Sequence, residues 1–179
     1  MISDLLNGER VRLVTLMPDD APLLSQWSRD SQLMRLASSR PASAQVEFNI
    51  RKEIEEAANS RRAYWFGIRL NEDDKLIGEI ELDDIEWTHG AAWYAILIGE
   101  AAYRGKGYGA EATRLILRFA FQELNLHRVQ LTVFGYNTAA MTMYERVGFT
   151  REGTFREFIH RDGMRYDMHL YGILRHEWE

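Results

Sequence analysis

The sequence predicts a mixed α/β fold, built around a central and mostly antiparallel twisted sheet of six to seven strands with about four flanking helices. Three observations support this prediction. Strand-like segments recur along the whole chain, segments with apolar residues at helical spacing interrupt them, and a glycine-rich stretch joins one strand to a long helix. The 179 residues are enough for a complete hydrophobic core, so we expect a single domain over residues 1–179.

The first half of the chain alternates short strands with two helices. Apolar residues recur at helical spacing from residue 43 to residue 58, which predicts an amphipathic helix, and residues 18–29 suggest a shorter one. Strands are expected where apolar and polar side chains alternate, or where a β-rich run lies between polar turns such as residues 71–74. The expected strands are residues 9–16, 63–70, 75–87 and 91–99.

The second half repeats this alternation with stronger boundary signals. From Tyr108 onward, apolar residues recur at positions 0, 4, 7, 8 and 11, which predicts a long helix with one apolar face. A second helix is expected from Asn137 to Gly148, because asparagine is a strong N-cap and glycine commonly ends a helix. Residues 162–163, Asp-Gly, have the composition of a hairpin turn. The expected strands are residues 128–134, 149–160 and 164–174.

Composition and charge exclude several classes of function. Lys and Arg number 22 against 27 Asp and Glu, a formal net charge of −5, which does not favour nucleic acid and suits a small cationic substrate better. The absence of cysteine excludes disulfides, thiolate metal sites and cysteine nucleophiles, and the histidines show no metal-binding spacing. The longest apolar run, residues 91–99, is far shorter than the ~18 residues that suggest a membrane span. We therefore expect a cytoplasmic protein without a nucleic-acid or membrane partner.

A glycine-rich loop is the first candidate for binding chemistry. Gly105, Gly107 and Gly109 precede a long helix, where unpaired N–H groups and the helix dipole attract an anion, usually pyrophosphate. Arg104 and Lys106 add positive charge. A glycine-rich turn without a ligand is the alternative. A Walker A loop is excluded because glycine, not Ser or Thr, follows Lys106. A dinucleotide fold is strongly disfavoured because the next strand ends without an acidic residue.

Two motifs carry a resemblance to a known family. Residues 104–109 read RGKGYG directly after an expected strand, and residues 137–149 match N-x-x-A-x-x-x-Y-x-x-x-G-F. On these motifs, in this order and about thirty residues apart, the chain resembles the GNAT superfamily of N-acetyltransferases over essentially its whole length. Its tail is similar to the branch that acetylates ribosomal-protein N-termini, which also contains spermidine acetyltransferases. The chain departs from the family pattern at two positions. Ala101 stands where the family often has proline, and Thr132 stands where some members carry a glutamate that acts as a base.

The resemblance implies the GNAT fold and acetyl-coenzyme A as co-substrate. In the family, two strands splay apart and the pantetheine arm pairs with free strand backbone, where an N–H can polarise the thioester carbonyl. The pyrophosphate lies on backbone N–H groups of the glycine-rich loop, and the capping asparagine also contacts the coenzyme arm. The implied cofactor-binding residues are Leu97, Ile98, Gly99, Arg104, Gly105, Lys106, Gly107, Tyr108, Gly109, Ala110 and Asn137.

Two residues are predicted to act in catalysis. Tyr144 fits its helix as a core residue, yet its place in the second motif implies that it protonates the departing thiolate. Because a thiol has a pKa of ~8.5 and a tyrosine ~10, this transfer is uphill unless the site stabilises tyrosinate or Tyr144 only hydrogen-bonds the sulfur. Glu79, Glu81 and Asp83 share one face of a strand, which is either solvated surface or the border of the acceptor site. A water relay to Glu81 or Asp83 is the predicted route for the amine proton, and Glu81 is the preferred base.

The acceptor is the least defined part of the prediction. A protein or peptide α-amine is the first choice, a polyamine or other small amine the second, and a catalytically silent acyl-coenzyme A-binding domain the alternative from another class. The resemblance implies that residues 17–60 supply the acceptor side. Aromatic residues there or nearby either line the acceptor pocket or pack in the core. The aromatic candidates are Trp27, Phe48, Tyr64 and Trp65. The aromatic content is also compatible with a homodimer surface.

Overall fold

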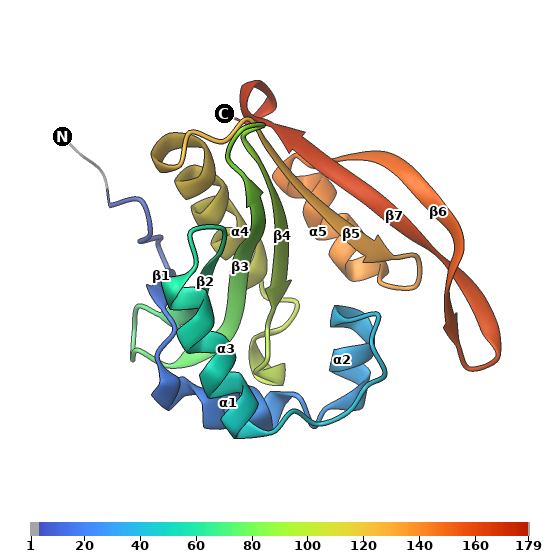
Figure 1. Cartoon of the computed structure of the whole chain (residues 1–179), viewed down its shortest axis with the longest axis horizontal. Helices are drawn as coiled ribbons and strands as arrows, with labels where there is room; N and C mark the ends of the chain where they lie inside the picture. Colours follow the sequence, from blue (N-terminus) through green and yellow to red (C-terminus); the bar gives the residue numbers. More distant parts are fainter. Residues whose placement is uncertain (1–3, 179) are drawn as a thin grey trace.

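A computed structural model describes residues 4–178 and contains, in that range, a seven-stranded sheet with five α-helices around it (Figure 1). The strand order is β1-β2-β3-β4-β5-β7-β6, and every neighbouring pair is antiparallel except β4 and β5. This confirms the predicted fold class. The strands are β1 (Val11–Thr15), β2 (Tyr64–Leu70), β3 (Leu76–Glu86), β4 (Ala91–Leu97), β5 (Arg128–Phe134), β6 (Thr150–Arg161) and β7 (Met164–Leu174).

The helices include one that was not predicted. They are α1 (Ala21–Trp27), α2 (Ser31–Ala37), α3 (Glu47–Asn59), α4 (Tyr108–Arg118) and α5 (Thr138–Val147). The missing element is α2, whose start is marked by Asp30: its carboxylate accepts a hydrogen bond from the Leu33 N–H at 3.0 Å. Seven residues with one buried side chain leave little apolar periodicity to detect. Short helical turns also occur at Pro18–Asp20, Ala101–Tyr103, Phe119–Glu123 and Arg175–Glu177.

Two apolar clusters hold the layers together. Helix α4 lies behind the sheet and buries Ala112 and Ile116 against the Ile80 and Leu82 face of β3, whereas α1 and α3 lie in front of the sheet (Figure 1). The second cluster joins α1 and α3 through residues such as Leu24 and Ile54. Because side chains alternate along β3, its acidic residues point away from the first cluster and toward the α3 side.

The sheet opens between β4 and β5. These strands pair only through Ala91–Trp93 and Arg128–Gln130, and beyond this point the two strands diverge (Figure 1). The predicted strand over residues 91–99 ends at Leu97, because the carbonyl groups of Ile98 and Gly99 accept hydrogen bonds from the Arg104 side chain instead. The second half of β4 therefore has a ladder partner, β3, on one side only.

Helix α5 has the ends that its sequence predicts. The Asn137 side chain accepts a hydrogen bond from the Ala140 N–H at 3.2 Å, and Gly148 ends the helix at φ 117°, in the left-handed region that favours glycine. Helices α2 and α5 flank the opening between β4 and β5. Among residues 4–178, no helix has both the length and the apolar character that crossing a bilayer requires.

Candidate active site

A cleft of about 540 Å³ runs from the open end of β4 to the groove between α4 and α5. It gathers eight of the eleven residues predicted to bind the cofactor. These eight are Leu97, Ile98, Arg104, Gly105, Gly107, Gly109, Ala110 and Asn137. The other three lie beside it: Gly99 packs against the ring of Trp27, Lys106 is exposed, and the ring of Tyr108 packs edge-on against Tyr103.

The glycine-rich loop has the geometry of an anion cradle. Gly107 is the N-cap residue of α4 and has φ 87°, and Gly105 has φ 71°. Residues other than glycine rarely adopt this backbone conformation. The N–H groups of the first turn of α4 have no partners within the helix. A Cβ on Gly105 would meet nothing within 4 Å, so the loop leaves room beside its backbone. A phosphate group fits this helix start and its dipole.

Arg104 makes contacts that the sequence motif does not predict. Its Nε donates to the Ile98 carbonyl at 2.9 Å and its Nη2 to the Gly99 carbonyl at 2.6 Å. Its Nη1 lies 3.4 Å from the Asp30 carboxylate at the start of α2. The guanidinium therefore ties the loop to the end of β4 and to α2 while also lining the cleft.

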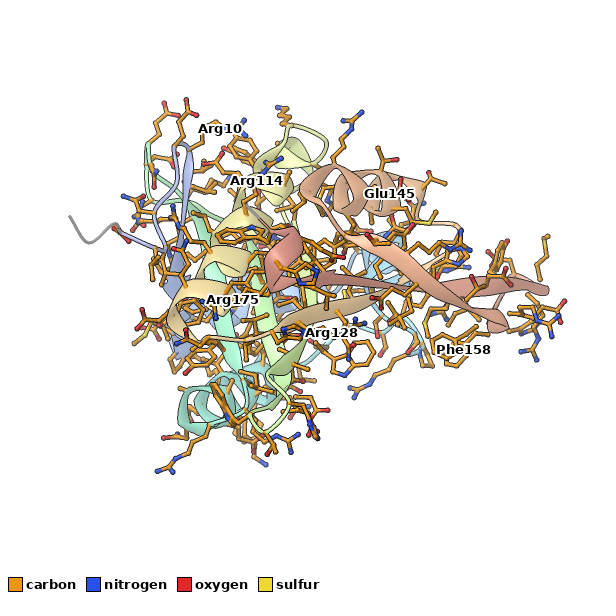
Figure 2. The ribbon with its side chains drawn as sticks, turned by 90° about the horizontal axis from the view of Figure 1, so that it is seen from above. Arg10, Arg114, Arg128, Glu145, Phe158 and Arg175 are labelled. Atoms are coloured by element: carbon orange, nitrogen blue, oxygen red, sulfur yellow. The ribbon has the colours of Figure 1, made fainter. Side chains whose placement is uncertain are left out.

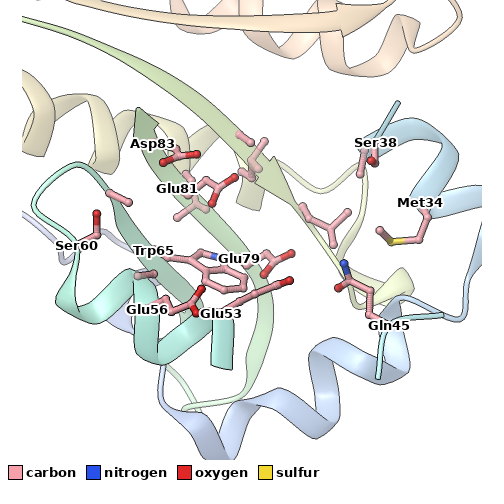
Figure 3. A pocket seen from close by; sticks show the side chains of 17 residues that line it. Met34, Ser38, Gln45, Glu53, Glu56, Ser60, Trp65, Glu79, Glu81 and Asp83 are labelled. Carbon is pink, nitrogen blue, oxygen red and sulfur yellow. The ribbon is translucent and has the colours of Figure 1, made fainter. Parts of the chain in front are cut away.

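A second cavity, of about 520 Å³, lies between β3, α3 and α2 (Figure 3). Five carboxylates line it, and no Lys, Arg or His does so within residues 4–178. The sequence left two alternatives for the strand face that carries Glu79, Glu81 and Asp83: solvated surface or the border of a site. In the structure this face borders a cavity. The carboxylates are Glu53, Glu56, Glu79, Glu81 and Asp83.

Two of these carboxyl groups have strongly raised pKa values. Burial, then the charges of Glu81 and Glu53, raises the pKa of Glu79 to about 8, although the neighbouring Trp65 acts in the opposite direction. One Glu79 oxygen, Oε2, is shut off from solvent and has no hydrogen-bond partner among the described residues. Burial, then Asp83 and Glu53, raises the pKa of Glu81 to about 7. At neutral pH Glu79 is therefore mostly protonated and Glu81 partly so, and a cation that enters the cavity lowers both pKa values and favours the charged carboxylates.

The two cavities meet at the end of β4. Ala37, Ile96 and Leu97 line both of them. A group carried along the cleft and an amine held by the carboxylates would therefore approach each other beside the unpaired edge of β4. Helix α2 forms part of both walls, with Met34 on the acidic side and Leu33 on the other.

Tyr144 lies in the core rather than in either cavity lining. Its side chain is 7% exposed, and its ring packs edge-on against Tyr94 at 6.0 Å and Phe149 at 5.8 Å between centroids. Burial raises its pKa above the ordinary value. The phenol therefore stays protonated over the whole physiological range.

Sequence reasoning missed part of the acidic cavity. Glu53 and Glu56 come from α3 and are three residues apart, so they share one helix face. This spacing is visible in the sequence and could have predicted the pair. Of the aromatic candidates for the acceptor side, Trp65 lines the cavity, whereas Trp27 is a core residue and Phe48 is 73% exposed.

Comparisons with known proteins point to one family. The family described as an acetyltransferase (GNAT) domain matches residues 10–150. An uncharacterized N-acetyltransferase of Bacillus subtilis, YokL, derived from the SPbeta prophage, is 32% identical over 96% of this chain and 94% of its own length. The spermidine N(1)-acetyltransferase of Escherichia coli K12 is 27% identical over 96% and 90%, and a putative ribosomal N-acetyltransferase of B. subtilis, YdaF, is 33% identical over 60% and 58%.

The same fold occurs in a solved structure. The spermidine N-acetyltransferase of Vibrio cholerae, crystallised with coenzyme A and spermine, superposes with a TM-score of 0.86 over 95% of this chain and 98% of that one. At 23% sequence identity this likeness concerns the fold.

Proposed function

The chain belongs to the GNAT family of acetyltransferases and is an acetyl-coenzyme A-dependent N-acetyltransferase, and we propose that its acceptor is a small polycationic amine of the polyamine type. The observation that carries this proposal is the cavity of five carboxylates, lined by no basic side chain among the described residues, that meets the cofactor cleft at Ile96 and Leu97. Several carboxylates attract an acceptor with several charges more strongly than one with a single charge. The likeness to the spermidine acetyltransferase of E. coli supports this choice of acceptor.

The cleft residues hold the acetyl donor. When bound, acetyl-coenzyme A supplies the thioester that the acceptor amine attacks directly. The N–H groups at the start of α4 would hold its diphosphate, and Leu97 at the free edge of β4, with Ile98 after it, would orient its arm, with Asn137 on the other wall. Lys106 and Tyr108 belong to this loop: the Lys106 carbonyl accepts a hydrogen bond from the Arg10 guanidinium, which also lies over the ring of Tyr108.

Glu81 is proposed as the group that accepts the amine proton, through water. A polyamine-like nitrogen with a pKa of ~10.4 is neutral in well under 1% of molecules at pH 7, so a base increases the reactive fraction. The pKa of Glu81, about 7, suits a general base at neutral pH. The positive charge of the acceptor opposes this rise in pKa, so binding favours the ionised form of Glu81 that can accept a proton.

Tyr144 is proposed to hydrogen-bond the departing sulfur rather than to surrender its proton. Its raised pKa makes full transfer to a thiolate unfavourable, whereas a neutral phenol remains a hydrogen-bond donor. The role is supported by its packing against Tyr94 of β4, because the next residues of that strand, Ala95 and Ile96, line the acidic cavity.

A protein or peptide α-amine is the second candidate acceptor. The likeness to the putative ribosomal acetyltransferase and the resemblance of the tail to that branch favour it. An α-amine with a pKa near 7.8 is neutral in about 10–15% of molecules at pH 7 and needs less help from a base. On this alternative the carboxylates are not needed for deprotonation.

The deciding experiment is a panel of acceptors read by release of the coenzyme A thiol. It compares spermidine, a diamine, a monoamine of similar length and a short peptide with a free N-terminus, for the wild type, Glu53→Gln and Glu55→Gln. Glu55 lies on α3 but does not line the cavity, so it is the matched control. We expect kcat/KM to rise with acceptor charge, and Glu53→Gln to reduce this preference several-fold. A peptide preferred over spermidine, with no effect of Glu53→Gln, would contradict the proposal.

A further inference from the structure

The cofactor cleft extends past the glycine-rich loop to two arginines that the motifs do not include. Arg114 on α4 and Arg146 on α5 line its far part, and both side chains are exposed. Arg114 lies seven residues after Gly107 and Arg146 nine residues after Asn137, which at 1.5 Å per helical residue places each about 10 Å or more beyond its helix start. Figure 2 marks Arg114 on α4, with α5 beside that helix.

These two arginines have no partner within residues 4–178. Neither guanidinium forms an ion pair or a hydrogen bond there, and no Asp or Glu lines this cleft. The arginines nearest the loop are occupied: Arg104 binds the carbonyl groups at the end of β4, and Arg10 binds Glu111. The cleft is therefore positive at its far end, in a chain with a net charge of −5, whereas the neighbouring acceptor cavity is negative.

Coenzyme A carries three phosphate groups, of which the diphosphate accounts for two. If the diphosphate lies at the start of α4 and the pantetheine arm runs toward β4, the nucleotide end leaves the loop in the opposite direction. That direction is the groove between α4 and α5, where Arg114 and Arg146 stand on opposite walls. A guanidinium binds phosphate with two parallel, charge-assisted hydrogen bonds.

We propose that Arg114 and Arg146 form a second phosphate site, which binds the ribose 3′-phosphate of coenzyme A and selects donors that carry it. The site acts on the established co-substrate and does not depend on which amine is acetylated. The two arginines are specificity-determining residues: they distinguish coenzyme A from its 3′-dephospho form, while the glycine-rich loop serves both.

The test is calorimetric binding of coenzyme A and 3′-dephospho-coenzyme A without any acceptor amine. We expect the wild type to bind coenzyme A about tenfold or more tightly than the dephospho form, since charge-assisted hydrogen bonds are strong. In Arg114→Gln/Arg146→Gln the ratio should fall to within about twofold, with the affinity for the dephospho form unchanged. In the wild type, high salt should reduce the same ratio.

A matched control and the single variants make the outcome decisive. Arg156→Gln removes an exposed arginine of β6 that lies outside this cleft, and it should leave the ratio unchanged. Each single variant should lower the ratio part of the way, and these measurements stand if the double variant does not fold. An equal loss of affinity for both ligands, or an unchanged ratio, would overturn the proposal. Because no amine is present, neither result bears on the acceptor.

Discussion

The Nε atom of Arg10 lies 2.9 Å from Oε2 of Glu111, although the two residues are 101 positions apart in the sequence. Glu111 also accepts hydrogen bonds from the N–H groups of Arg10 and Val11, at 2.7 and 3.2 Å. The Arg10 guanidinium in turn donates to the Lys106 carbonyl at 3.1 Å and stacks 4.6 Å above the ring of Tyr108. Arg10, directly before β1, thus fixes the glycine-rich loop to the first turn of α4.

Arg10→Gln should therefore weaken coenzyme A binding several-fold without lowering kcat at saturating coenzyme. The side chain shapes the loop but lies away from the reacting groups, so its loss acts on binding alone. Calorimetry and steady-state kinetics measure the two effects. Arg12→Gln is the control, because Arg12 lies two residues further along, in β1, and pairs with Asp74 instead. Similar losses of coenzyme affinity in both variants would show that the effect is general destabilisation.

Gly107→Ala should reduce coenzyme A affinity by about 1–3 kcal/mol. The new Cβ would require φ 87° of an alanine and would lie 3.2 Å from the Arg10 guanidinium. Gly163→Ala, at φ 74° in the β6–β7 turn with nothing within 4 Å, introduces the same backbone strain away from the cleft. The control should lose stability and keep its coenzyme affinity. A folded Gly107→Ala protein with wild-type affinity would remove the loop from the binding site.

Tyr144→Phe should lower kcat by about 10²-fold and leave coenzyme affinity nearly intact, because it removes only the hydroxyl group. Tyr171→Phe is the matched control: its ring also packs against Tyr144, and its hydroxyl donates to Glu145 at 2.8 Å. Rapid-quench measurement of the acetyl-transfer step distinguishes chemistry from product release. Wild-type turnover in Tyr144→Phe would make Tyr144 a core residue only.

The acidic cavity should make the protein less stable as the pH rises. Glu79 and Glu81 have folded-state pKa values of about 8 and about 7, above the ordinary value of 4.5, so the folded state binds more protons in this interval. Stability should accordingly fall from about pH 5 to pH 8. Glu79→Gln should raise the melting temperature at pH 8 by several degrees relative to the wild type, with little difference at pH 5, as scanning calorimetry can measure. If the melting temperatures of Glu79→Gln and the wild type differed by the same amount at pH 5 and pH 8, the raised pKa values would be contradicted.

The sequence predicted the sheet, the glycine-rich loop and α5 because local signals mark them. Alternation along β3, the left-handed glycines and the Asn137 and Gly148 caps each act over a few residues. What it did not predict depends on contacts between distant segments. Helix α2 is short and lines both cavities, and the loop is braced by Arg10 from far upstream.

The acceptor side shows the same limit. Glu81 was chosen from its place on a strand face, but the cavity that raises its pKa forms only when α3 brings Glu53 opposite that face. The five carboxylates of the cavity come from two separate segments, α3 and β3, so neither their number nor the burial of Glu79 can be read from one segment of the sequence. On these features we propose a polycationic amine ahead of an α-amine, which was the first choice from the sequence.

The dependence of kcat/KM on pH for spermidine, in the wild type and in Glu81→Gln, tests most directly whether the acidic cavity binds and deprotonates the acceptor. The wild-type profile should rise through about pH 7, as Glu81 ionises, and fall in magnitude at 1 M salt, where the Debye length is ~3 Å. Glu81→Gln should lose this inflection and at least tenfold of kcat/KM, while Glu72→Gln, in the exposed turn before β3, behaves as the wild type. Superimposable profiles for the wild type and Glu81→Gln would contradict the account.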